Sequence, residues 1–193
     1  MKPQANNWLS EIIAALAIIL LLAPSAMAQS AQSCKKFVQS FYTWYIPQMT
    51  KNVPIPCNER ILKEKASYFS PTLLAMLRED QRESAKVTDE IVGLDFDPYI
   101  NGQETPKRYL AGKASRRGKG YLVEVFDVSE GKKGKDPAVI PELLFSKGKW
   151  VFTNFHYYKT SFAANENLIS ILKIQKEARL KYASEHKTHS STK

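Results

Sequence analysis

The apolar residues in the first half of the chain recur at helical spacing. Phe37, Phe41 and Trp44 are four and three residues apart, so they lie on one side of a helix expected over 35–45. Pro47 is expected to end this helix, because proline has no backbone N–H group to donate. The segment after it is expected to be extended.

Three further helices are expected downstream. The first covers 59–68, and the second begins at Ser70, a good N-cap residue, with Pro71 in the first helical position. The last is expected over 165–182. Between them, the stretch 91–103 is interrupted by Gly and Pro and is expected to form a buried, irregular loop.

Aromatic and β-branched residues then gather in four short runs that turn residues separate. The expected strands are 108–115, 121–128, 139–145 and 150–158. Because the connections between them are short, consecutive strands are expected to pair as an antiparallel meander. The pattern predicts a single α+β domain over 29–183, followed by a disordered polar tail over 184–193.

The N-terminus has the pattern of a signal peptide. An apolar run of 12 residues over 12–23 is shorter than the roughly 20 residues that a membrane-spanning helix requires. The small-residue motif that ends at Ala28 predicts cleavage before Gln29, which removes a leader of residues 1–28. The alternative is an uncleaved membrane anchor. No later stretch is apolar enough to span a membrane.

The predicted export sets the compartment and the partners. We expect a periplasmic or secreted protein, whose net charge of +9 favours an acidic protein or an anionic component of the envelope. Nucleic acid is not an expected partner outside the cell. The alternative interpretation of the charge is solubility alone.

The two cysteines, Cys34 and Cys57, are expected to form a disulfide. A helix over 35–45 is about 16 Å long, and the extended segment after it can reach back over that length. The alternative is a pair of buried free thiols.

Four stretches have a distinctive composition: 37–45 (FVQSFYTWY), 70–74 (SPTLL), 93–103 (GLDFDPYINGQ) and 150–158 (WVFTNFHYY). They resemble the bacterial secreted proteins grouped as domain-of-unknown-function family 3828, within the nuclear transport factor 2-like superfamily. The resemblance implies an α+β cone, in which N-terminal helices pack on a strongly curved four-strand sheet, in an extracytoplasmic setting. It implies no established activity and no catalytic residue.

Three residues are candidates for acid–base chemistry. If the loop is extended at Asp95 and Asp97, both carboxylates project to one side, and either can pair with His156 as a general base. The alternative is that the carboxylates accept backbone N–H groups and that the histidine is packed and hydrogen-bonded. We expect no metal site, because two carboxylates without further ligand spacing do not make one.

An aromatic hollow with polar groups above it is the candidate pocket for a small ligand. Alternation along the last strand is expected to place Trp150, Asn154 and Tyr158 on one face. The other expected lining residues are Trp44, Tyr99 and Asn101. The alternative is that these residues belong to the core.

Basic residues cluster in the turns between the expected strands. In a meander the first and third turns lie at the same end of the sheet, which brings two groups of cations together. The resulting candidate patch consists of Arg116, Arg117, Lys119, Lys147 and Lys149. A second group, Lys132, Lys133 and Lys135, is expected at the opposite end. The alternative is that these are simply solvated turns.

The sequence favours a non-enzymatic binding or interaction module of the bacterial envelope, either a toxin-neutralising protein or an accessory protein. It carries no phosphate-binding loop, no nucleophile elbow and no Cys-x-x-Cys or His-Glu-x-x-His motif, and no cofactor is expected. The alternatives are a small hydrolase or isomerase that uses an Asp/His pair, or a carrier of an apolar ligand.

Overall fold

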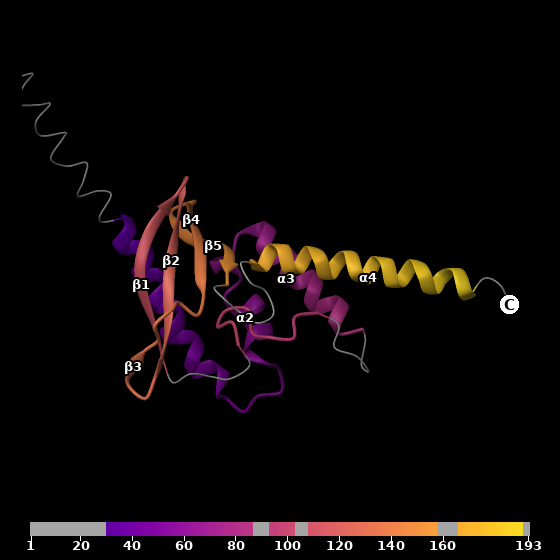
Figure 1. Cartoon of the computed structure of the whole chain (residues 1–193), viewed down its shortest axis with the longest axis horizontal. Helices are drawn as coiled ribbons and strands as arrows, with labels where there is room; N and C mark the ends of the chain where they lie inside the picture. Colours follow the sequence, from indigo (N-terminus) through magenta and orange to yellow (C-terminus); the bar gives the residue numbers. More distant parts are fainter. Residues whose placement is uncertain (1–29, 87–92, 103–107, 158–165, 191–193) are drawn as a thin grey trace, which may run out of the picture.

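The computed structural model describes residues 30–86, 93–102, 108–157 and 166–190 (Figure 1). The predicted leader, its cleavage site at Ala28 and Gln29, the candidate Tyr158 and the last three residues of the expected tail lie outside these ranges.

The described part of the chain contains four α-helices and a short 3-10 helix. The N-terminal helix covers 30–49, so it is longer than expected at both ends, and Pro47 lies in its last turn. It is followed by α2 (Cys57–Glu64), the 3-10 helix η1 (Ala66–Tyr68), α3 (Pro71–Ser84) and α4 (Leu168–Ser190). The predicted start of α3 is confirmed, because the Ser70 hydroxyl accepts a hydrogen bond from the Leu73 amide at 3.3 Å.

The strands form one open antiparallel sheet in the order β1-β2-β4-β5. Their bounds are β1 Arg108–Arg117, β2 Gly120–Ser129, β4 Ile140–Ser146 and β5 Lys149–His156. A two-residue strand, β3 (Lys132–Lys133), pairs with the end of β2 and makes a fifth member that the sequence pattern did not indicate. The α+β class and the antiparallel meander are therefore confirmed.

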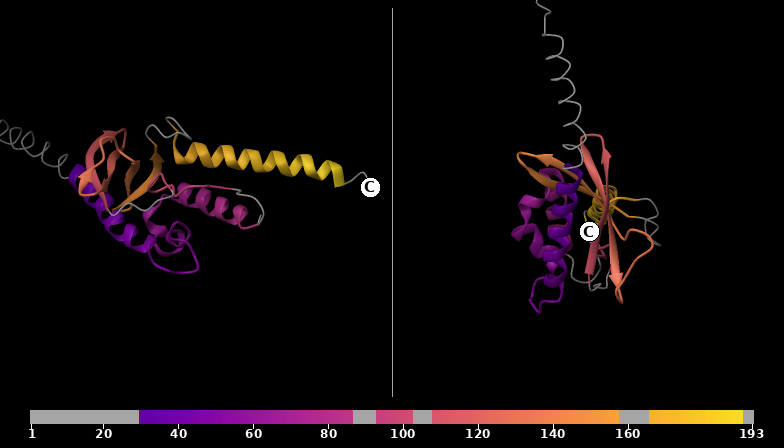
Figure 2. Two further views of the ribbon diagram at one scale, coloured as in Figure 1. Left: turned by 60° about the horizontal axis from the view of Figure 1, so that its bottom comes forward. Right: turned by 90° about the vertical axis from the view of Figure 1, so that its left-hand side faces the viewer.

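The N-terminal helix covers one face of the sheet, while α3 lies alongside α4, beyond β5 (Figures 1 and 2). The ring centroids of Phe41 on the N-terminal helix and Phe152 on β5 are 4.9 Å apart, and both side chains are fully buried. At Gly120, a Cβ atom would collide with the carbonyl oxygen of Leu143, so only glycine permits the close pairing of β2 with β4.

A β-bulge in β5 changes which residues share a face. Leu143 pairs with Phe152 but Glu142 pairs with Asn154, which leaves Thr153 as an extra residue. In the uninterrupted β4, Phe145 and Glu142 are three residues apart and therefore face opposite ways. Trp150 pairs with Phe145 and Asn154 pairs with Glu142, so these two side chains also point to opposite faces of the sheet. The prediction that Trp150 and Asn154 share one face is therefore wrong.

The disulfide expected between Cys34 and Cys57 is not formed, and both are buried, free thiols. The Cys57 thiol lies near the side chain of Tyr45, which is eleven positions after Cys34 in the same helix. Eleven helical residues span about 16 Å, whereas the Cα atoms of a disulfide lie within about 7 Å of one another. The segment that joins the N-terminal helix to α2 thus brings Cys57 back only to the C-terminal part of that helix, and not to Cys34 near its start.

The last helix is also longer than expected. It continues to Ser190, so that residues 184–190 of the predicted tail are helical. Its first half packs on α3, where Arg179 forms an ion pair of 2.6 Å with the buried Asp80 and Lys176 forms one of 2.8 Å with Glu79. The helix then extends away from the sheet, across the direction of the strands (Figures 1 and 2).

Candidate functional site

Five exposed cations occupy one end of the sheet, which we call the basic end. The strand register pairs Gly120 with Leu144, so the β1–β2 turn and the β4–β5 turn lie side by side. The residues of the basic end are Arg116, Arg117, Lys119, Lys147 and Lys149, and all five are exposed.

An aromatic pair lies within the basic end. Phe145 is 55% exposed, and its ring centroid is 5.1 Å from that of Trp150, in an edge-to-face arrangement. The Trp150 indole N–H donates to the Ser33 hydroxyl at 3.2 Å. The start of the N-terminal helix therefore lies at this same end of the sheet.

The acidic residue Glu142 reaches the basic end from the middle of β4. Glu142 Oε2 is 2.8 Å from His156 Nε2 and 3.9 Å from Arg117 Nη1, and the two nitrogen atoms are 3.5 Å apart. The three side chains form a polar bridge across the sheet. The candidate base His156 is thus paired with Glu142, whereas Asp97 takes its partners elsewhere.

The other lysine group lies at the opposite end of the sheet, around β3. Lys132, Lys133 and Lys135 are exposed, and Lys133 Nζ stands 3.7 Å from the ring centroid of Phe126. This group has no exposed aromatic residue comparable to Phe145 among the residues that the structure describes.

The two loop carboxylates have different surroundings. Asp95 is exposed, while the Asp97 carboxylate accepts hydrogen bonds from the Tyr45 hydroxyl at 2.6 Å and from the Tyr99 amide at 2.9 Å. Burial raises the pKa of Asp97 to about 6, although hydrogen bonds from Tyr45 and from backbone amides oppose this shift. Asp97 thus holds the loop in place, although it also lines an open depression together with Asp95 and Cys57.

Further tyrosine hydroxyls hold the loop backbone. Tyr42 donates to Tyr99 O at 2.6 Å, Tyr157 to Pro98 O at 3.1 Å and Tyr109 to Ile100 O at 3.2 Å. The candidate pocket residue Asn101 adopts a positive φ of 55° and donates to Ala138 O at 3.1 Å. The polar groups of this loop therefore have structural partners.

The other candidate pocket residues lie apart from one another. Trp44 lies on the outer side of the N-terminal helix, where Lys65 Nζ is 4.8 Å from its ring centroid. Tyr99 is fully buried, and Asn154 accepts from the amides of Phe155 and Ile169, the latter at the start of α4. Trp150 and Asn154 also face opposite sides of the sheet. The predicted pocket residues therefore do not line one common hollow.

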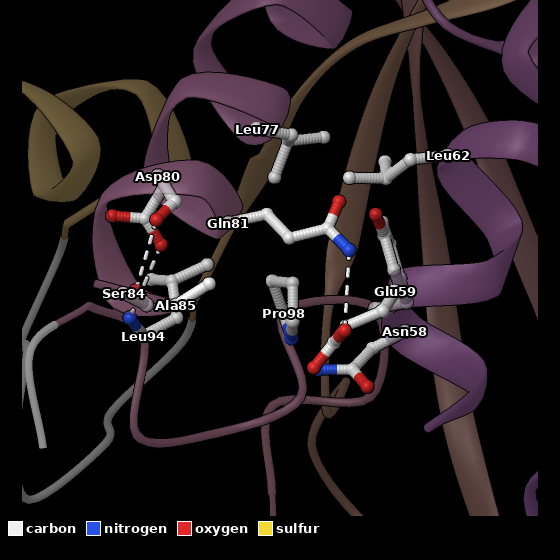
Figure 3. Close-up of a pocket in the computed structure, with 11 residues that line it drawn as sticks. Asn58, Glu59, Leu62, Leu77, Asp80, Gln81, Ser84, Ala85, Leu94 and Pro98 are labelled. Atoms are coloured by element: carbon white, nitrogen blue, oxygen red, sulfur yellow. Dashed lines mark hydrogen bonds between the residues drawn. The ribbon is translucent and has the colours of Figure 1, made fainter. Parts of the chain in front are cut away.

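A different cavity, of about 250 Å³, lies between α2, α3 and the loop (Figure 3). Gln81 on α3 points toward Glu59 on α2 and donates to it at 3.1 Å, while Asp80 accepts from the Leu94 amide at 3.3 Å. Tyr99 also lines this cavity, and its buried hydroxyl has no partner among the described residues. Sequence patterns did not indicate this cavity, because its lining residues on α2, α3 and the loop are brought together only by tertiary packing.

Two further findings concern the described part of the chain. It contains no group of three or more His, Cys, Asp or Glu side chains arranged to hold a metal ion. None of its helices combines the length and the apolar character that crossing a membrane requires.

Comparisons with protein-family models, with curated proteins and with solved structures find no match to this chain.

Proposed function

We propose that the chain is an exported binding module of the bacterial envelope and that it docks on an acidic partner through the basic end. The observation that supports this most is the convergence of two cationic turns at one end of the sheet, with Phe145 exposed at the same end. Clustered charge of one sign accelerates and orients association with a surface of the opposite sign.

The contacts of the acid–base candidates favour a binding role over catalysis. Asp97 is engaged by Tyr45 and by the loop backbone, and His156 is engaged by Glu142. A toxin-neutralising protein and an envelope accessory protein both fit such a module. The nuclear transport factor 2-like cone stays a prediction, which the packing of the N-terminal helix on one face of an antiparallel sheet supports.

Charge reversal at the two ends of the sheet tests the proposal. Lys147→Glu with Lys149→Glu is expected to reduce retention of the protein by an envelope fraction roughly tenfold or more, because attraction becomes repulsion. Lys132→Glu with Lys135→Glu changes the net charge by the same amount at the opposite end, so it serves as the matched control and is expected to leave retention unchanged. Both pairs are exposed, which preserves the fold.

The measurement is co-sedimentation of the purified, exported protein with envelope material at low and high salt. Equal losses in the two variants would show that net charge alone matters, and unaltered binding in both would remove the basic end from the proposal.

A further inference from the structure

We infer that the surface on which the basic end docks is a bilayer of anionic phospholipid, with Phe145 entering the headgroup layer. This inference rests on the proposed function and specifies the partner. Four features of the basic end point to lipid rather than to a folded acidic protein.

The first feature is the shape of the two turns. Lys147 and Gly148 both have positive φ values, 50° and 78°, as in a tight two-residue hairpin turn, and Gly118 has a φ of 56° in the other turn. Tight turns present their cations at narrow tips. A fluid headgroup layer can receive such tips without a matching shape, whereas a stable protein interface of roughly 800 Å² per partner requires shape complementarity.

The second feature is the local balance of charge. Glu142 lies 3.9 Å from Arg117 and is also paired with His156 at 2.8 Å, while the three lysines Lys119, Lys147 and Lys149 are exposed. Each Lys or Arg near an anionic membrane contributes attraction on the order of 1 kcal/mol, so several cations on two adjacent tips act together.

The third feature is Phe145. An aromatic side chain that is 55% exposed beside lysines gains little from water, but it can bury its ring at the boundary between headgroups and acyl chains. Its edge-to-face contact with Trp150 fixes its direction at the end of the sheet.

The fourth feature is where the chain enters the fold. The Trp150–Ser33 hydrogen bond places the first turn of the N-terminal helix at the basic end. Residues 24–29 separate this helix from the apolar run over 12–23, and even fully extended they span only about 20 Å. While the leader is in the membrane during export, the basic end is thus the part of the fold nearest to the lipid.

The test is co-sedimentation of the exported protein with two kinds of vesicle. One is phosphatidylcholine alone, and the other contains about one-third phosphatidylglycerol, which supplies the negative surface potential that attracts basic segments. Binding is expected to the anionic vesicles only, and it is expected to fall with added salt because the attraction is electrostatic.

Three variants identify the contacting residues. Lys147→Glu with Lys149→Glu is expected to lower the affinity for anionic vesicles tenfold or more, while Lys132→Glu with Lys135→Glu leaves it unchanged. Phe145→Ala is expected to lower it several-fold, because the lost ring burial does not depend on charge. Leu180→Ala is the matched control for Phe145, since Leu180 is 62% exposed on α4, away from the basic end.

The outcomes separate this inference from the proposed function. If envelope retention depends on the basic end but pure anionic vesicles do not bind, the lipid inference fails and an acidic protein or glycan is the partner. Equal binding to neutral vesicles, or no effect of Phe145→Ala, also contradicts it. If neither the envelope nor the vesicles respond to charge reversal, both proposals fail.

Discussion

Tyr45 and Tyr99 lie side by side in the core, with ring centroids 5.4 Å apart, but their hydroxyls differ. That of Tyr45 donates to the Asp97 carboxylate, whereas that of Tyr99 has no partner among the described residues. Tyr45→Phe is therefore expected to lower the free energy of unfolding by about 1–3 kcal/mol, because it leaves a buried carboxylate with one donor fewer. Tyr99→Phe is expected to change it by less than about 0.5 kcal/mol.

Urea unfolding of the two variants beside the wild type measures both effects, provided that the m-value does not change. The two substitutions remove the same atom from neighbouring rings. Equal destabilisation would therefore show that the contact with Asp97 is not what distinguishes the two tyrosines.

Asp97 also makes stability depend on pH. Its pKa is about 6 in the folded protein against an ordinary value of 3.8, so between these values the folded chain holds a proton that the unfolded chain has released. The free energy of unfolding is expected to fall as pH rises from about 4 to about 6, by an amount on the order of 3 kcal/mol. Below about pH 4 the Asp97 carboxyl is protonated in both the folded and the unfolded chain, so the stability that its protonation provides is fully present.

Asp97→Asn removes this titration and keeps an oxygen that can accept from the Tyr99 amide. The difference in unfolding free energy between wild type and variant is expected to decline over the same pH window and to be flat outside it. A difference that is constant with pH would assign the titration to another group.

At the scale of elements, the N-terminal helix keeps the two cysteines apart. Burial raises the pKa of Cys34 to about 12 and that of Cys57 to about 11, so both are protonated at neutral pH and are poor nucleophiles. A thiol reagent is expected to react slowly with the folded protein. After unfolding in urea without reductant, it is expected to react readily with both cysteines. Absence of reactive thiols in the unfolded chain would reveal the disulfide that the structure lacks.

The sequence predicted those elements whose signals are local. The helical stripe of Phe37 and Phe41, the N-cap at Ser70 and the Gly-containing strand turns depend on residues a few positions apart, and the structure has each of them. The bulge at Thr153 depends on the pairing of β5 with β4, which alternation within one strand cannot reveal. The disulfide prediction was wrong because the path of a connector depends on the packing of α2.

At the scale of the whole molecule, the first half of α4 supplies contacts to α3 and to the loop. Gln175, Lys176 and Arg179 contact Gly93, Glu79 and Asp80, whereas 180–184 is exposed. Deleting 183–193 is expected to change the free energy of unfolding by less than about 0.5 kcal/mol. Deleting 175–193 is expected to cost about 3–5 kcal/mol, because Asp80 is left buried without its cation.

Thermal or urea unfolding of the two truncated chains measures this difference. A large loss from the shorter deletion would show that the outer part of α4 makes stabilising contacts. The same long-range pairing explains why the cavity beside Asp80 could not be predicted: Arg179 lies 99 positions later in the chain. The basic end was accessible to prediction because a meander fixes which turns are neighbours.

The direction of α4 has a consequence for how the protein would sit on lipid. The helix crosses the strands, and its 23 residues are about 34 Å long. With the hairpin tips pointing into the headgroups, α4 would run parallel to the bilayer plane. The outer part of α4 would then keep one distance from the bilayer, whichever way the protein rotates about the membrane normal. A fluorescent label beside Tyr182 would report that single distance from the bilayer.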